Sequence, residues 1–393
     1  MKRTLATHDP TTCDRMVGVP LDWRELRPLT VPAAVHPRGQ PHLSAASGLV
    51  CAFDRVYVVA DDEHHLGLFD DALAPGRLHR VAAGDLPREA GARKRRKADL
   101  ETLMWVPRAG GASEVAGCAS RTAGGTSRVA GGASQVAGSA SSVARRAPTG
   151  ADRASLVGSA FAGDGGALWL LGSGSTPARD RAFVQPLDGA GEPCGDAQAV
   201  DLAPLYEPLR ARLGALNIEG ALVQPGQGLW LFNRGGSGER GRNVIAHYAG
   251  PRVLAWLHAR RGRAGRAAVA LAPTSLREVP LGAVQGVGYG FTDAAALPAS
   301  LGGGCLFTAV AEDSADSVAD GACVGSALGR LGPAGELRWL RPLRDAPKVE
   351  GLALHAGPHG LTLCLATDAD DPQVASRLLL AHLPGRAVEG RLR

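Results

Sequence analysis

The chain lacks the cysteine patterns that build metal-bound or disulfide-linked folds. Its seven cysteines are odd in number and scattered along 393 residues, with no CxxC pair and no zinc-type pairing with histidines. Cys51, Cys305, Cys323 and Cys364 fall in apolar runs, where a free thiol behaves as a small hydrophobe. This pattern favours a reduced, cytoplasmic protein.

Long apolar runs are also missing. No window approaches the roughly 20 apolar residues of a membrane-spanning helix, and the N-terminus has no apolar core of signal-peptide length. Most of the formal net charge of +5 lies in one run, Arg93–Lys97. A nucleic-acid patch is one interpretation of that run, but no aromatic platform accompanies it. We therefore expect a solvated loop, no nucleic-acid partner and no membrane association.

The sequence does contain a recurring pair of apolar runs framed by acidic or small polar residues. The pair occurs five times, beginning near Ser47, Asp99, Asn217, Thr292 and Val349. A self-similar β unit of roughly 50–75 residues has the size of a propeller blade. Short runs of Val, Leu, Trp and Phe broken by Gly, Pro and Asp also indicate an all-β fold.

Each repeat divides into four predicted strands, except the last, which has three. These strands are 47–53, 55–60, 65–69, 77–82, 99–106, 167–172, 181–187, 197–202, 218–223, 228–233, 243–248, 275–280, 292–297, 304–310, 322–331, 336–343, 349–354, 360–366 and 376–383. The clearest helical periodicity covers 205–216.

The missing strand is expected from the other end of the chain. Residues 23–29, WRELRPL, echo residues 337–343, LRWLRPL, the outer strand of the fourth repeat. An N-terminal strand at 21–31 that completes the last blade would close the ring and remove its exposed edges. The alternative is a chance likeness between two amphipathic strands. The prediction is an all-β, five-bladed β-propeller over residues 1–393 as one domain.

Residues 109–143 form five tandem seven-residue units, and we place a low-complexity insertion over 109–147, between the first two strands of blade two. Ala-Gly-Gly opposes a helix, and no pair of large apolar residues exists for a coiled coil. Small residues bury too little area to offset the entropy of ordering, so the insertion is predicted to be a flexible loop.

The polar residues that frame the apolar runs form the candidate site. In a propeller blade the first strand starts, and the second ends, at the same mouth of the central channel. The candidate metal ligands there are Asp61, Glu101, Glu219, Asp293, Glu312, Glu350 and Asp368. Such a ring is costly unless a cation lies among the carboxylates or several are protonated. Oxygen ligands without paired His or Cys suit Ca²⁺ or Mg²⁺, so a divalent cation, Ca²⁺ first, is the predicted cofactor.

Two interpretations of these carboxylates stay open. Acidic residues at strand ends can simply cap turns by accepting backbone N–H bonds. Glu is a poor turn residue, however, so its recurrence at Glu101, Glu219 and Glu350 favours a site. Glu219, Glu350 and Asp293 are also the candidate catalytic groups.

Candidate anion-binding groups lie beside the carboxylates. One polar loop supplies Ser173, Ser175, Arg179 and Arg181. Asn233 and Arg234 stand at the matching place one blade later. These arginines are open to two interpretations, plain ion pairing or a clamp for an anionic substrate bridged to a metal.

Several phrases of the sequence carry a resemblance to known proteins. They are KADLETL at 97–103, GSGSTPARDRA at 172–182, NIEGALVQPGQGLWLFNRGG at 217–236, KVEGLAL at 348–354 and ATDADDP at 366–372. The chain resembles a family of uncharacterised bacterial β-propeller proteins, and it is similar in style to phytase-like and gluconolactonase-like propellers. In those enzymes the metal sits at the channel mouth. Gluconolactonase-like enzymes are usually six-bladed, so their ligands are not transferred to this chain.

The leading hypothesis is a divalent-cation-dependent hydrolase that acts on a small anionic phosphoester or lactone at the channel mouth. The alternative is a non-catalytic propeller that binds a small ligand or a partner there. A third possibility is a scaffold whose carboxylates only hold turns. We expect a monomer.

Overall fold

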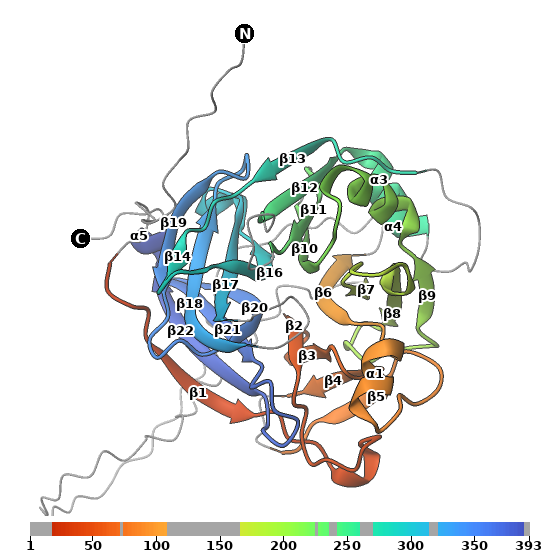
Figure 1. Ribbon diagram of the computed structural model, residues 1–393. Helices are drawn as coiled ribbons and strands as arrows, with labels where there is room; N and C mark the ends of the chain where they lie inside the picture. The colour runs from red at the N-terminus through yellow and green to blue at the C-terminus, as the bar shows by residue number, and fades with distance from the viewer. Residues whose placement is uncertain are drawn as a thin grey trace, which may run out of the picture.

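The chain forms a ring of small antiparallel sheets. The computed structural model describes residues 18–70, 74–107, 166–224, 227–235, 242–259, 270–313 and 321–388. Five four-stranded sheets stand as blades around a central channel (Figure 1), which confirms the predicted five-bladed β-propeller. No helix in these ranges is long and apolar enough to cross a membrane.

The blades follow one another along the chain, each with its first strand innermost. Blade one has β2 (Ala46–Ala52), β3 (Arg55–Ala60), β4 (His65–Phe69) and β5 (Arg77–Arg80). Blade two has β6 (Leu100–Pro107), β7 (Gly166–Gly172), β8 (Arg181–Leu187) and β9 (Gln198–Asp201). Blade three has β10 (Ile218–Gln224), β11 (Gly228–Asn233), β12 (Val244–Ala249) and β13 (Ser275–Glu278). Blade four has β16 (Gly290–Ala296), β17 (Cys305–Asp313), β18 (Ala322–Leu331) and β19 (Leu337–Pro342).

The last blade takes its outer strand from the N-terminal part of the chain. It contains β20 (Val349–Gly357), β21 (Gly360–Thr367), β22 (Arg377–Pro384) and β1 (Trp23–Pro28). β1 runs antiparallel to β22, with Trp23 opposite Ala381 and Pro28 opposite Arg377. The predicted closure is confirmed, and Figure 1 shows β1 on the outside of the ring beside β22.

The hydrophobic core lies between the blades. Five clusters of buried side chains each join the facing sides of two neighbouring blades, and the cluster between blades five and one completes the circle. Strands in the middle of a blade are therefore covered on both faces. This explains why β7 reads GALWLLG and is buried over nearly its whole length.

Helices lie at the periphery of the ring. α3 (Ala203–Leu213) is the helix predicted near 205–216. α4 (Pro251–Ala259) and the short α5 (Gly385–Val388) were not predicted, nor was the two-stranded sheet of β14 (Ala283–Val284) and β15 (Val287–Gly288). α1 (Ala90–Arg96) replaces the loop predicted for the basic run, because Glu89 caps its first turn through the N–H groups of Gly91 and Ala92.

The insertion predicted at 109–147 lies outside the described residues. Its flanks are described: β6 ends at Pro107, β7 begins at Gly166, and these two residues are opposite each other in the ladder. The insertion therefore interrupts a β-hairpin whose ends already meet. The expectation that residues 1–393 form one domain stays a prediction.

Candidate functional site: the channel mouth

The innermost strand of every blade carries the same irregularity near its start. In each ladder between the first and second strands the register shifts by one residue. A bulge of this kind leaves one residue out of the pairing and re-aims its side chain. The bulged residues are Ser47, Glu101, Glu219, Thr292 and Glu350. Three of the five blades therefore present a glutamate at an equivalent place.

The second strands end beside these bulges. In four blades the residue after the last pair of the ladder donates its N–H to the carbonyl two residues before the bulge. The donors are Asp61 to Ala45 (3.0 Å), Ser173 to Asp99 (2.9 Å), Arg234 to Asn217 (2.8 Å) and Asp368 to Lys348 (3.0 Å). In blade four, β17 instead runs on to Asp313 and carries Glu312 further along the same edge. The mouth is thus assembled from one repeated backbone arrangement.

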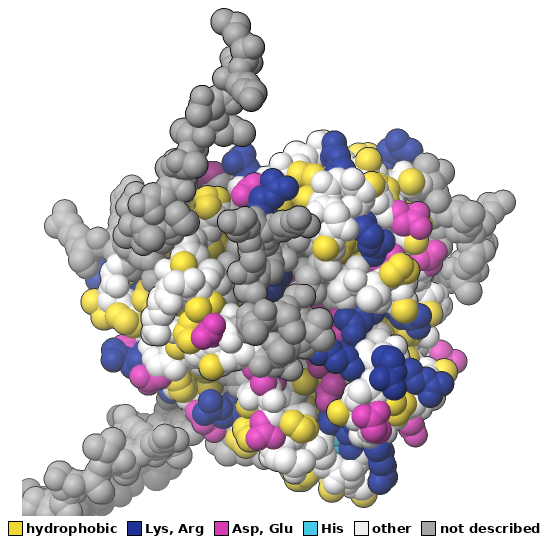
Figure 2. Space-filling model, viewed as in Figure 1, with side chains coloured by type: hydrophobic (Ala, Val, Ile, Leu, Met, Phe, Trp, Pro, Cys, Tyr) yellow, Lys and Arg dark blue, Asp and Glu magenta, His cyan; other side chains and the backbone are white. Residues whose placement is uncertain are grey.

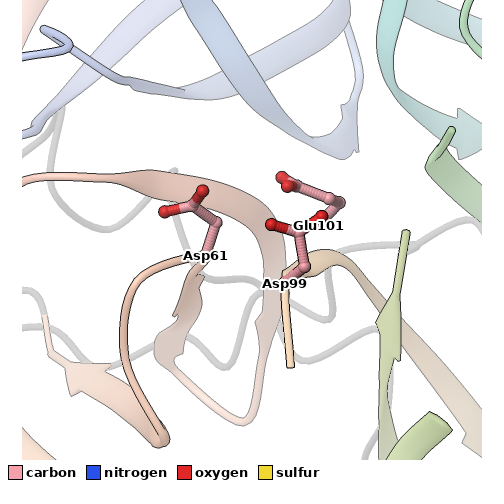
Figure 3. Close-up of side chains that lie close together, drawn as sticks. All are labelled: Asp61, Asp99 and Glu101. Carbon is pink, nitrogen blue, oxygen red and sulfur yellow. The ribbon is translucent and has the colours of Figure 1, made fainter. Parts of the chain in front are cut away.

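Blades one and two form the first half of the mouth. Asp61, Asp99 and Glu101 each offer a carboxylate oxygen within 4.8 Å of the other two. Figure 3 shows the three side chains together; Asp61 directly follows β3, Asp99 directly precedes β6, and Glu101 lies in β6. The Lys97 ammonium lies 2.9 Å from Asp99 Oδ1 and also contacts Asp61. Arg179 Nη1 donates to Asp99 Oδ2 over 2.7 Å.

Glu101 differs from its two neighbours in the cluster. Within the described part of the chain, no hydrogen bond or ion pair reaches its carboxylate, whereas Asp61 and Asp99 are both paired. Burial, followed by repulsion from Asp99, Glu219 and Asp61, raises the pKa of Glu101 well above its ordinary value. Burial also raises the pKa of Asp61 to about 6, although Lys97 opposes the shift. Three ionised carboxylates would exceed the charge of Lys97 and Arg179, and the raised pKa of Glu101 shows that a proton relieves this excess in the metal-free protein.

Blades three to five form the second half of the mouth. Arg234 Nη2 donates to Glu312 Oε2 over 2.7 Å, and its Nη1 lies 3.8 Å from Glu219 Oε1. Lys348 Nζ lies 2.7 Å from Glu312 Oε1, 3.7 Å from Glu350 Oε1 and 3.8 Å from Asp368 Oδ2. Each cation of this half thus lies between carboxylates from different blades.

The carboxylates of this second half do not share one protonation behaviour. Burial opposes the ionisation of Glu312, but Arg234 and Lys348 outweigh it and lower its pKa. Burial raises the pKa of Glu350 to about 7, of Glu219 to about 8 and of Asp368 to about 8. Burial alone would lower the pKa of Lys348, but its carboxylate neighbours, Glu350 first, raise it. Lys348 therefore stays charged.

Two predicted site residues point elsewhere. Asp293 follows the bulge at Thr292, is 1% exposed, and accepts the N–H groups of Ala294 and Leu352, both over 2.8 Å. Its carboxylate thus ties blade four to blade five. Arg181 begins β8 and is exposed, with no described ion pair.

The remaining predicted anion-binding groups are engaged with the protein itself. Ser173 Oγ donates to Asp99, and Ser175 Oγ accepts from Arg179 Nη1 over 2.7 Å. Asn233 Oδ1 accepts the Asn217 N–H over 2.8 Å. In this state these side chains organise the mouth.

Sequence reasoning did not find Lys97 or Lys348. It expected either a cation among the carboxylates or protonation of several of them, and the protein supplies cations of its own in Lys97, Arg179, Arg234 and Lys348. A signal was present, since Lys97 stands four residues before the bulged Glu101, in KADLE, and Lys348 two residues before the bulged Glu350, in KVE. Lys97 was instead counted with the basic run. The other basic residues of that run belong to α1, and Lys and Arg side chains gather over that helix in Figure 2.

Comparisons with known proteins give families without an assigned activity. Residues 154–372, more than half of the chain, match a family of unknown function, DUF6910, and residues 42–126 match a second family of unknown function, DUF6929. No curated protein matches the chain. The expected membership of a family of uncharacterised proteins is thus confirmed, while the likeness to phytase-like and gluconolactonase-like propellers stays a prediction.

Proposed function

For this chain, which belongs to the DUF6910 family of unknown function, we propose that the channel mouth binds a divalent cation, Ca²⁺ first. The site is the cluster of Asp61, Asp99 and Glu101, and the bound cation holds a small anionic ligand. The observation that carries this proposal is Glu101, a carboxylate carried into the mouth on a bulge and left without a described cationic partner.

The donor set suits a hard cation. Ca²⁺ binds 6–8 oxygen ligands at 2.3–2.6 Å, so two oxygens on one ion lie at most about 5 Å apart. The oxygens of Asp61, Asp99 and Glu101 already lie within 4.8 Å of one another. The cluster contains neither imidazole nor thiolate, the ligands that favour zinc or copper. Water and the anionic ligand would complete the coordination.

Lys97 competes for the same oxygens. Its ammonium contacts Asp61 and Asp99, two of the three proposed ligands, and so stands in for the cation in the metal-free protein. A divalent ion would displace this ammonium from Asp61 and Asp99, and it would also bind the carboxylate of Glu101. Neutralising Asp99 would also free Arg179, whose guanidinium then faces an anion bound to the metal.

The test is calorimetric titration of metal-stripped protein with CaCl₂. We expect binding of one ion, and a Kd at least tenfold weaker for Glu101→Gln. Glu350→Gln is the matched control, because Glu350 holds the equivalent bulge position but lies outside the cluster. That variant should bind Ca²⁺ within about threefold of the wild type.

A second variant tests the competition. Lys97→Met keeps the aliphatic stem and removes the ammonium, so it should bind Ca²⁺ more tightly and gain a larger rise in Tm from it. A hundredfold excess over Kd stabilises a protein by about 2.7 kcal/mol. If Ca²⁺, Mg²⁺ and Mn²⁺ produce neither heat nor a Tm shift in the wild type or in Lys97→Met, the site is wrong.

Hydrolysis of a phosphoester or lactone is the second candidate, and the pKa values of the second half of the mouth favour it. A general base works best with a pKa near the operating pH. The pKa of Glu350 is raised to about 7 and that of Glu219 to about 8, mainly by burial. Ca²⁺-dependent turnover of a lactone and phosphoester panel, lost in Glu350→Gln, would support catalysis. Ligand binding without turnover would leave a non-catalytic binding propeller.

A further inference from the structure

Three blades carry a large aromatic residue at one equivalent position of the second strand. These residues are Tyr57, Trp169 and Trp230. Each is paired with a residue of the first strand of its blade, and that partner is always four residues after the start of the strand. Their exposed fractions are 0%, 0% and 2%, and each packs in the cluster shared with the following blade. The segment that packs on each ring therefore fills the space between two neighbouring blades.

The first two rings are covered by the chain itself. The Tyr57 hydroxyl donates to the Gly191 carbonyl over 2.6 Å, in the turn between β8 and β9 of blade two. Trp169 packs against Trp256 of α4, with ring centroids 5.9 Å apart. That helix lies in the connection between β12 and β13 of blade three. In both cases the third-to-fourth-strand connection of the next blade closes the space.

The third ring is not covered in this way. The corresponding connection of blade four is the short turn between β18 and β19, and a cavity of about 600 Å³ remains between it and Trp230. Its lining includes the apolar side chains of Trp230, Ile245, Leu276 and Pro333. A volume of 300–1,000 Å³ is typical of small-molecule sites.

The histidine in the lining has unused bonding capacity. His247 Nε2 lies 3.1 Å from the Gln227 carbonyl and must donate to it, which leaves Nδ1 of the neutral ring as an acceptor.

Arg277 supplies positive charge at the rim. Its side chain lies along the backbone of Gly335, and no ion pair or hydrogen bond to its guanidinium is found among the described residues. Glu278, also in the lining, is already paired with Arg242 over 3.2 Å. The net attraction at the rim is thus for an anion, and a guanidinium binds carboxylates best.

We propose that this cavity, between blades three and four, is a second ligand site that takes a small aryl carboxylate. The aromatic ring of the ligand lies in the cavity against Leu276 and Pro333, over the buried Trp230, and its carboxylate pairs with Arg277. The site is separate from the channel mouth, because its lining includes none of the mouth residues. It depends on neither the metal nor the proposed activity.

The test is protein-observed NMR titration with phenylacetate, indole-3-acetate and 2-naphthoate, each beside its neutral amide. We expect the carboxylates to bind at sub-millimolar to millimolar Kd and to shift the Trp230 indole signal, assigned from Trp230→Phe. Arg277→Gln should weaken the carboxylates at least fivefold and leave the amides within twofold.

A filling variant provides the control for position. Ala334→Phe places a ring in the cavity from the turn between β18 and β19, and it should abolish binding. Ala190→Phe is the matched control, since it alters the corresponding turn of blade two and should leave binding unchanged. The highest ligand concentration is 10 mM, which is ~100-fold above the Kd of a tightly bound fragment. If none of the three acids shifts the Trp230 signal at that concentration, or if Ala334→Phe binds them as the wild type does, the proposal is overturned.

Discussion

Glu101, Glu219 and Glu350 hold the same place in three blades but meet different neighbours. Glu101 has no described partner, Glu219 accepts from Asn217 Nδ2 over 2.6 Å, and Glu350 lies 3.7 Å from Lys348 Nζ. The neighbours come from residues outside the repeated strand pair. Equivalent backbone positions therefore have different chemistry, and only the glutamate without a partner is left to bind an added cation.

Glu219 should make the stability of the metal-free protein depend on pH. Burial raises its pKa from the ordinary 4.5 to about 8, so between these values the folded protein keeps a proton that the unfolded chain has released. Stability must then fall as the pH rises through that window, by about a few kcal/mol at 1.36 kcal/mol per pKa unit. Glu219→Gln removes the contribution of this carboxyl group to the pH dependence of the unfolding free energy.

The measurement is the urea-unfolding free energy at pH 5 and pH 8.5. Glu219→Gln should lose less stability than the wild type between these two values, and at pH 8.5 it should be the more stable protein. Glu25→Gln, a change in a half-buried residue of the outer strand β1, serves as control and should follow the wild type. Parallel pH profiles for Glu219→Gln and the wild type would contradict the assigned charge state.

The residue types of the mouth were predictable, but their pairing was not. The recurring glutamates before Gly or Thr indicated a shared position, and the register shifts show why. Asp293 was assigned to the mouth because it stands at the start of a first strand. The bulge in blade four falls on Thr292, one residue earlier, and one residue of shift turns a side chain to the other face.

At the scale of elements, strands were easier to predict than helices. Strands such as β7 and β11 are buried on both faces, so their apolar runs are continuous and their ends coincide with Gly or Asn. α1 and α4 are short helices in connections between strands; α1 buries none of its residues, and α4 buries only Val253 and Leu257. Local sequence therefore gave no strong periodicity for either helix.

Shortening the insertion in blade two should leave the fold intact. Pro107 and Gly166 are opposite each other, so a short Gly-Ser linker in place of 109–143 joins ends that already meet. The entropy of closing a loop changes by only about 0.6 kcal/mol for each doubling of its length. We expect the Tm of the shortened protein to stay within a few degrees of the wild type, as measured by calorimetry. A fall of more than ten degrees (~2 kcal/mol or more) would show that the insertion stabilises the ring.

At the scale of the whole molecule, β1 completes the last blade beside the core cluster that joins blades five and one. β1 contributes one antiparallel ladder to β22, and Arg27, 4% exposed, donates to the Ala74 carbonyl over 2.6 Å. Sequence predicted this closure because the last repeat was one strand short and a matching segment stood at the other end. The cavity between blades three and four could not be predicted from the sequence. It exists because the turn between β18 and β19 is short, and no residue pattern marks such a turn as the edge of a cavity.

Removal of residues 1–31 should therefore open the ring. β22 would lose its partner and expose an edge, and exposed edges promote aggregation. We expect this variant to aggregate in light scattering at a temperature at which the wild type stays clear. Removal of residues 1–17 leaves β1 in place and is the control. A 1–31 deletion that stays clear with an unchanged Tm would show that the ring does not need β1.

The pairing of β1 with β22 also fixes an order of events during synthesis. β1 leaves the ribosome before the other described strands, but its partner β22, which begins at Arg377, is the last of them. At 5–20 residues per second, translation of the intervening chain takes about tens of seconds. β1 must stay unpaired throughout, while blades one to four can form as they emerge. Completion of the ring thus waits for the synthesis of β22, and it requires an early strand to find a late one.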